Sequence, residues 1–193
     1  MKNSGTVRME TKRLVLRPYV IEDADAMFRN WANDPQVTKY LSWEPHKDVE
    51  ETKQILEGWI KSYESKDFYT WAIARKEDEG NVIGSISVPQ LNQKAGRVTV
   101  GYCLGRNWWG HKIMKEAFAE LIRFFFEVEG ANRVEALHDT RNVNSGKVMM
   151  ACGLKKEGTS GSMGGIIRGY AMSVSMGWWL RIILKGNSRK YKE

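Results

Sequence analysis

The sequence predicts one domain of the mixed α/β (α+β) class, with a mostly antiparallel central sheet flanked by helices. Patterns typical of strands and helices follow one another along the 193 residues in the order β-α-α-β-β-β-α-β-α-β. The three central strands are joined by short turns, which connect antiparallel neighbours, so the sheet is not wholly parallel. No internal repeat or linker divides the chain, and its length suits a single domain spanning residues 1–193.

The first half of the chain begins with a strand at residues 11–18, where Leu14 and Leu16 alternate with Val15 and Arg17. Apolar residues at helical spacing then predict helices, and Asn33-Asp34-Pro35 ends the first of them. Turn residues at 78–81 and 92–96 separate the three central strands. The expected elements after the first strand are helices at 21–32, 37–41 and 48–63, and strands at 69–75, 82–89 and 97–104.

The second half opens with a glycine-bearing turn at residues 105–112, which leads into a helix at 113–128. A short strand at 133–137 and a helix at 144–152 follow, and Gly153 ends that helix. Another strand begins at 154–158. The pattern therefore predicts two strand-to-helix junctions, at which polar groups for chemistry gather.

Composition excludes several classes of protein. With 42% apolar and 27% charged residues, the chain is globular, and no apolar run approaches the roughly 20 residues that span a membrane. Residues after Glu157 hold +5 of the net charge of +7, so the rest is nearly neutral and binding of nucleic acid is not expected. Cys103 and Cys152 lack metal-ligand spacing and are expected as buried thiols, without a bound metal. The start of the chain lacks a signal peptide, which favours the cytoplasm.

Two junctions could carry chemistry. Residues 101–114 run from a strand through a glycine turn into a helix, whose first amides and dipole suit a pyrophosphate, although such junctions also occur without a ligand. Asn142-Val143-Asn144-Ser145 precedes the last helix. In one interpretation these residues are ordinary helix caps. In the other, one asparagine amide orients a cofactor and the Ser145 hydroxyl donates a proton.

In their order and spacing these segments resemble the GNAT superfamily of N-acetyltransferases, and within it the branch of ribosomal-protein alanine acetyltransferases. The resemblance covers about residues 10–158. It rests on Thr11-Lys12-Arg13-Leu14-Val15-Leu16-Arg17-Pro18, Gly84-Ser85-Ile86, Gly101-Tyr102, Trp108-Trp109-Gly110, Glu116-Ala117, Asn142-x-x-Ser145, and Gly153 with Glu157-Gly158.

The resemblance implies a sheet splayed between its fourth and fifth strands, with acetyl-CoA in the opening as co-substrate. The thioester would bind backbone on the fourth strand, and the pyrophosphate would bind amides of the turn. The implied cofactor-binding residues are Val100, Tyr102, Cys103, Leu104, Trp109, Gly110, His111, Lys112, Ile113, Met114, Lys115, Asn142 and Asn144. The implied reaction is direct attack by a neutral primary amine, and Ser145 would protonate the leaving thiolate. The acceptor would be a small molecule or a protein N-terminus, and a homodimer is compatible with the sequence.

The sequence also departs from the family pattern. Lys112 replaces the central glycine of the turn, where it adds either bulk or a positive charge beside the pyrophosphate. Many relatives carry a glutamate where this chain has Thr99, which cannot serve as a base. Glu44 and His46, in the loop between helices, are the remaining candidates, each either a catalytic base or a solvated loop residue, and a water molecule is an equal alternative. His111 and His138 are expected to be structural or exposed. Four aromatic residues are expected to line either an amine pocket or the core: Trp31, Trp43, Trp71 and Tyr102.

The segment after residue 158 departs most from the family, because no Asp or Glu occurs there before Glu193. Some choices of codons for residues 165–184, when they are read in a shifted frame, encode a segment that resembles the usual C-terminal sequence of this branch. This suggests a frameshift at about residues 159–165. Alternation of Tyr170, Met172, Val174 and Met176 would still allow a strand.

Two functions of different classes remain open at this point. The first is acetyl transfer to a primary amine, such as a protein N-terminus, an antibiotic or a polyamine. The second, favoured by Lys112, Thr99 and the altered tail, is a catalytically weak acyl-CoA-binding or ribosome-associated protein.

Overall fold

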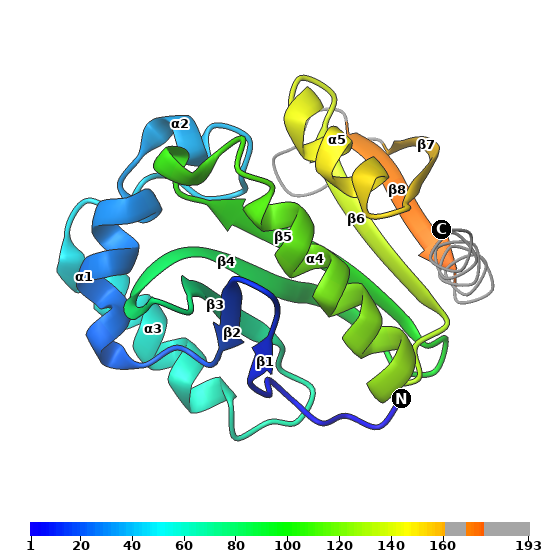
Figure 1. Ribbon diagram of the computed structural model, residues 1–193, viewed down its shortest axis with the longest axis horizontal. Coiled ribbons are helices and arrows are strands. Elements are labelled where there is room, and N and C mark those ends of the chain that lie inside the picture. Colours follow the sequence, from blue (N-terminus) through cyan, green and yellow to red (C-terminus); the bar gives the residue numbers. More distant parts are fainter. Residues whose placement is uncertain (161–168, 176–193) are drawn as a thin grey trace, which may run out of the picture.

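An eight-stranded sheet organises the residues that the structure, a computed structural model, describes: 1–160 and 169–175 (Figure 1). Its strand order is β1-β2-β3-β4-β5-β6-β8-β7, and only β5 and β6 are parallel. The strands are β1 (Met9–Glu10), β2 (Leu14–Arg17), β3 (Thr70–Arg75), β4 (Asp78–Asn92), β5 (Arg97–Leu104), β6 (Arg133–Asp139), β7 (Lys155–Ser160) and β8 (Gly169–Ser175). The expected mixed, mostly antiparallel sheet is confirmed.

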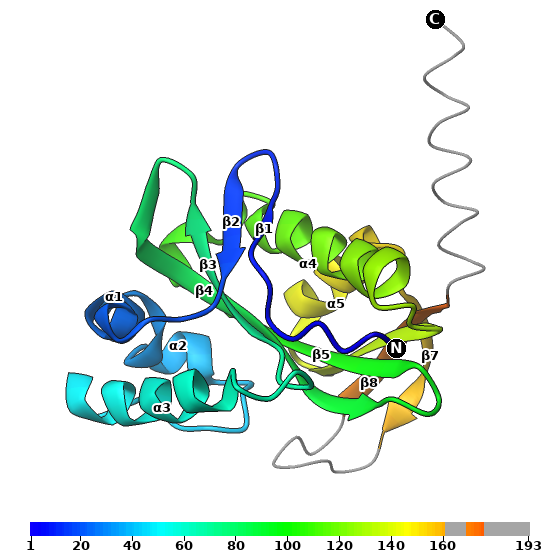
Figure 2. The ribbon, with the colours of Figure 1, turned by 90° about the horizontal axis from the view of Figure 1, so that it is seen from below.

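Helices cover both faces of this sheet (Figure 2). On one side lie α1 (Ala24–Met27), which continues as a π-helical turn over Phe28–Ala32, α2 (Pro35–Thr38) and α3 (Val49–Ser62). On the other lie α4 (Ile113–Arg123), which continues as a π-helical turn over Phe124–Val128, and α5 (Val143–Ala151). None of the helices in the described ranges has both the length and the apolar character needed to cross a bilayer.

Each helical layer closes its own apolar core against the sheet. The core under α4 and α5 contains Trp71, Phe118 and Phe125, all of them buried. The core under α1 and α3 contains Trp31 and Leu56, which are also buried. Trp31 and Trp71 are therefore core residues, which decides between the two alternatives that the sequence left open for them.

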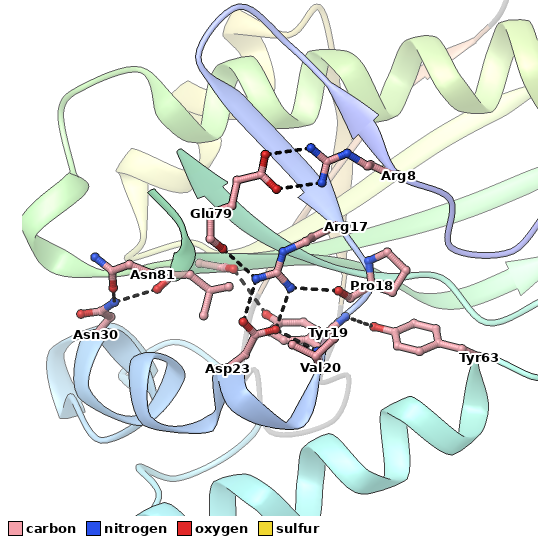
Figure 3. A network of polar contacts seen from close by, with 12 residues as sticks. Arg8, Arg17, Pro18, Tyr19, Val20, Asp23, Asn30, Tyr63, Glu79 and Asn81 are labelled. Atoms are coloured by element: carbon pink, nitrogen blue, oxygen red, sulfur yellow. Dashed lines mark hydrogen bonds and ion pairs between the residues drawn. The ribbon is translucent and has the colours of Figure 1, made fainter. Parts of the chain in front are cut away.

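The first long strand is fastened to its surroundings by Arg17 (Figure 3). Its guanidinium donates to both carboxylate oxygens of Asp23 at 2.8 Å, and also to the carbonyls of Pro18 and Glu79. Asp23 is buried, so this bidentate pair is shielded from solvent. One side chain thereby joins β2 to the first helical turn and to the start of β4.

The structure differs from the sequence prediction at strand β1 and at the first hairpin, and it agrees with it on a strand in the tail. The two-residue strand β1 was not expected. The first hairpin turn is at residues 76–77 and not at 78–81, because Asp78 already pairs with Arg75 and residues 79–81 form a bulge in β4. The alternating tail does form strand β8, in which Met172 and Val174 are buried. Met176 and residues 161–165 of the suspected frameshift lie outside the described residues.

A candidate active site where two strands part

The parallel strands β5 and β6 are paired only over their first halves. Their register runs from Arg97 opposite Arg133 to Val100 opposite Ala136 and then ends, although both strands continue. Beyond that point the free edge of β5 presents backbone polar groups without a strand partner, which makes it a place for a ligand to bind. The expected splay between the fourth and fifth long strands is therefore confirmed.

A cleft of about 850 Å³ opens at this splay. Its walls come from β5, β6, α2 and the segment after it, the turn before α4 with the first residues of α4, and α5. A bulge in β4, which shifts the register between Ser87 and Gln90, adds Pro89 and Gln90 to the wall beside β5. A volume of this size suits a large, elongated ligand.

The turn before α4 is shaped as an anion-binding site. Gly110 and Lys112 both adopt left-handed backbone conformations, with φ of 81° and 61°, and Lys112 is the N-cap residue directly before α4. The first amides of a helix have no partner within it and carry the positive end of its dipole. Lys112 and Lys115 both line the cleft, and Lys147 of α5 adds a third ammonium. This end of the cleft is thus suited to phosphate groups.

The indole of Trp109 fastens this turn to the sheet. Its Nε1 donates to the carbonyl of Leu104, the last residue of β5, at 2.7 Å. This hydrogen bond satisfies the last carbonyl of β5 and fixes the distance between the strand and the turn. A ligand lying along β5 would therefore meet the turn at a defined position.

A pair of hydroxyl groups lies on the wall of the cleft. The Tyr102 hydroxyl of β5 is 3.0 Å from the Ser145 Oγ of α5 and 3.0 Å from the Ser145 carbonyl. Burial raises the pKa of Tyr102 far above its usual value, so the phenol stays protonated. Ser145 is not the cap of α5: the Asn142 side chain has that role and accepts from the Ser145 amide at 3.2 Å. The Ser145 hydroxyl is therefore not required for capping.

Close packing of α5 on β6 sets the position of this hydroxyl pair. A Cβ added at Gly146 would lie 2.7 Å from His138 Nε2, which only a glycine avoids. His138 is buried, and its Nδ1 is 2.9 Å from the Asp139 carbonyl. The sequence did not reveal this contact, because the two residues lie on different elements.

Only one carboxylate lines the cleft among the described residues, that of Asp139. It forms a bidentate contact with Arg141 at 2.9 and 2.7 Å, which lowers the pKa of Asp139 to about 2. Arg141 in turn lies 5.7 Å from the centre of the Tyr40 ring. Burial raises the pKa of the cleft-lining Cys103 to about 12, so its thiol is unreactive at neutral pH.

The structure brings most of the expected site residues together. The following line the cleft: Val100, Tyr102, Cys103, Leu104, Trp109, Gly110, Lys112, Ile113, Met114, Lys115, Asn142, Asn144 and Ser145. His111 is exposed on the turn, and Glu44 is exposed on its loop; neither is among the lining residues. His46 lies beside Thr52, with Nδ1 2.8 Å from Oγ1, and also stands outside the lining.

Comparison with known proteins places this geometry in a family. The model of the acetyltransferase (GNAT) domain matches residues 13–155, which is most of the chain. The chain belongs to the GNAT family. The N-acetyltransferase p20 of Bacillus licheniformis, itself uncharacterised, is 36% identical over 149 residues, covering 77% of this chain and 82% of that protein. The ribosomal protein uS5-alanine N-acetyltransferase of Escherichia coli is 26% identical and covers 81% of this chain and 82% of its own.

Solved structures agree with this assignment. An acetyltransferase structure from T. thermophilus has a TM-score of 0.78 and 28% identity, covering 95% of this chain and 97% of that one. The acetyltransferase MccE, solved with acetyl-CoA and AMP, has a TM-score of 0.75 at 16% identity and shows the shared fold. As a GNAT protein the chain is an acetyl-CoA-dependent N-acetyltransferase, which transfers an acetyl group to an amine.

Proposed function

We propose that this GNAT enzyme transfers the acetyl group directly from acetyl-CoA to a primary amine that is neutral when it attacks. The amine nitrogen attacks the thioester carbon, the C–N bond forms, and the C–S bond breaks. Ser145 gives its proton to the leaving sulfur and regains one through the Tyr102 hydroxyl and solvent, while the acetylated nitrogen loses its extra proton to water. The single observation that carries this proposal is the Tyr102–Ser145 contact of 3.0 Å on the wall of the cleft.

In this proposal acetyl-CoA lies along the free edge of β5. The thioester meets backbone at Val100 to Leu104, and the pyrophosphate meets amides between Gly110 and Lys115. Lys112, Lys115 and Lys147 balance the phosphate charge. Asn142 and Asn144 bind the cofactor from the α5 side.

The charge of the cleft favours a particular kind of amine. The Asp139 carboxylate is already paired with Arg141, and residues 158–192 contain no Asp or Glu. A polyamine or other polycation would therefore find no free carboxylate on the described walls to balance its remaining charge. Deprotonation is also easier for an α-amino group, with a pKa near 8, than for a lysine side chain near 10.4. We propose an α-amino acceptor, at a peptide or protein N-terminus or on a small molecule.

The test measures thiol release from acetyl-CoA with three acceptors: a peptide with a free N-terminus, the same peptide with a blocked N-terminus and a free lysine, and spermidine. We expect the first to react fastest. Calorimetric titration of acetyl-CoA accompanies the assay. Binding without thiol release in any of the three would favour the catalytically weak acyl-CoA-binding protein, and faster turnover of spermidine would contradict the acceptor class.

A further inference from the structure

A cluster of polar side chains outside the cleft joins the N-terminal strands to the turn before α4. Glu116, in the first turn of α4, accepts from the Thr11 hydroxyl at 2.6 Å and from the Arg13 amide at 2.9 Å. Its second oxygen accepts from Arg13 Nε at 2.7 Å. Arg13 Nη2 continues to the carbonyl of His111 and donates to it at 3.1 Å. One arginine thus contacts both the helix and the turn that precedes it.

The cluster holds Glu116 as a carboxylate. Burial alone raises the pKa of Glu116, but the hydroxyl, the amide and the guanidinium more than offset this effect, and its pKa is lowered overall. A carboxylate in the first turn of a helix is also favoured by the helix dipole. The Arg13 side chain stays in place because its partner is ionised and is itself held by the Thr11 hydroxyl and the Arg13 amide.

The contact with the His111 carbonyl has a consequence for the cofactor-binding turn. In a trans peptide the carbonyl of one residue and the amide N–H of the next point in opposite directions. Arg13 fixes the His111 carbonyl on the side of the β1–β2 connection, so the Lys112 amide must point away from it. Lys112 lines the cleft, whereas Arg13 does not. The orientation of a cofactor-binding amide is thereby set by a residue about one hundred positions earlier in the sequence.

We infer that Arg13, held by Glu116, is a positioning residue for binding of the acetyl-CoA pyrophosphate. This inference rests on the proposed placement of the pyrophosphate on residues 110–115. Arg13 itself touches neither cofactor nor acceptor and acts through the His111–Lys112 peptide. The left-handed backbone of Lys112 makes this support necessary, since a side chain at positive φ is strained and the turn tends to relax.

The experiment compares acetyl-CoA with S-acetylpantetheine, which carries the same thioester but lacks the pyrophosphate and nucleotide. For Arg13→Ala we expect KM for acetyl-CoA to rise about five- to twentyfold with kcat within about twofold, because one fixed charged hydrogen bond is lost. Its kcat/KM for S-acetylpantetheine should match that of the wild type. Arg13→Lys keeps a charge beside Glu116 but cannot contact His111 as well, so it should reproduce most of the rise.

Arg123→Ala is the matched control. Arg123 lies at the far end of α4, the helix that carries Glu116, and pairs with Glu120 and Glu127 away from the turn. It should leave KM for both thioesters unchanged. A folded Arg13→Ala enzyme that keeps the wild-type preference for acetyl-CoA would overturn the inference; should that variant not fold, Arg13→Lys decides in the same way. A wild-type enzyme that shows no preference for acetyl-CoA would instead refute the placement of the pyrophosphate.

Discussion

Replacement of Lys112 by glycine separates the strain at this residue from its charge. A side chain in the left-handed region costs about 1–2 kcal/mol, and glycine costs about 0.5–1 kcal/mol through the greater freedom of the unfolded chain. The φ of 61° at Lys112 therefore makes Lys112→Gly stabilising by roughly 0.5–1 kcal/mol. In a chain of this length that corresponds to a rise in Tm of about 1–4 °C, measurable by thermal unfolding.

Affinity for acetyl-CoA should change in the opposite direction. The backbone at Lys112 already has the conformation that glycine prefers, so the substitution gains no better presentation of the amides. It does remove an exposed ammonium from the phosphate end of the cleft, which costs about 0.2–1 kcal/mol, or up to about fivefold in Kd. The loss should shrink as salt rises. The backbone conformation at Lys112 therefore favours a role for its positive charge over a role for its bulk.

Lys112→Ala is the control, because it removes the charge but keeps a Cβ at positive φ. It should lose the same affinity and gain no stability. A lower Tm for Lys112→Gly would contradict the strain argument. Tighter binding of acetyl-CoA by Lys112→Gly, measured by calorimetry at low salt, would refute the charge argument and indicate crowding.

Three other predictions follow from the site. Ser145→Ala should lower kcat about 10–100-fold with little change in KM or Tm, since Asn142 caps the helix; equal rates for the mutant and the wild type would exclude Ser145 as the acid. The pH profile of kcat/KM should follow the pKa of the acceptor amine. The pKa of Asp139 is about 2 and that of Cys103 about 12, so neither group changes charge near neutral pH. Burial lowers the pKa of His46, which is therefore already neutral above pH 7. An α-amine and a lysine amine should then show different inflections, and a common inflection would reveal a base on the enzyme. Gly146→Ala should lower stability by about 1–3 kcal/mol and also reduce kcat, since the added methyl pushes α5 from His138; unchanged unfolding would show that the helix shifts freely.

The sequence was sufficient for the features that depend on local pattern. Alternation at Leu14 and Leu16 located β2, and the glycine turn before Ile113 located the start of α4. The hairpin at residues 76–77 was missed because Gly80 and Asn81 carry the stronger turn signal, whereas the structure absorbs them in a bulge. Strand β1 was missed because a two-residue strand has no period to detect.

Contacts between elements that are distant along the chain could not be predicted from the sequence. The individual residues Tyr102 and Ser145 were both singled out, but their contact depends on how closely α5 packs on β6. The link from Arg13 to His111 crosses 98 positions and leaves no local pattern. The assignment of Glu44 as a base stays a prediction, and its exposed position gives it no support from the cleft.

The raised pKa of the Cys103 thiol has a consequence for the fate of the acetyl group. A free thiolate beside a thioester can exchange with it and capture the acyl group as a dead-end protein thioester. Because burial raises the pKa of Cys103 to about 12, its thiolate is far scarcer at neutral pH than that of an ordinary cysteine. The cleft can therefore include a cysteine among its lining residues without losing acetyl groups to its thiol, and the amine keeps its kinetic advantage as the acceptor.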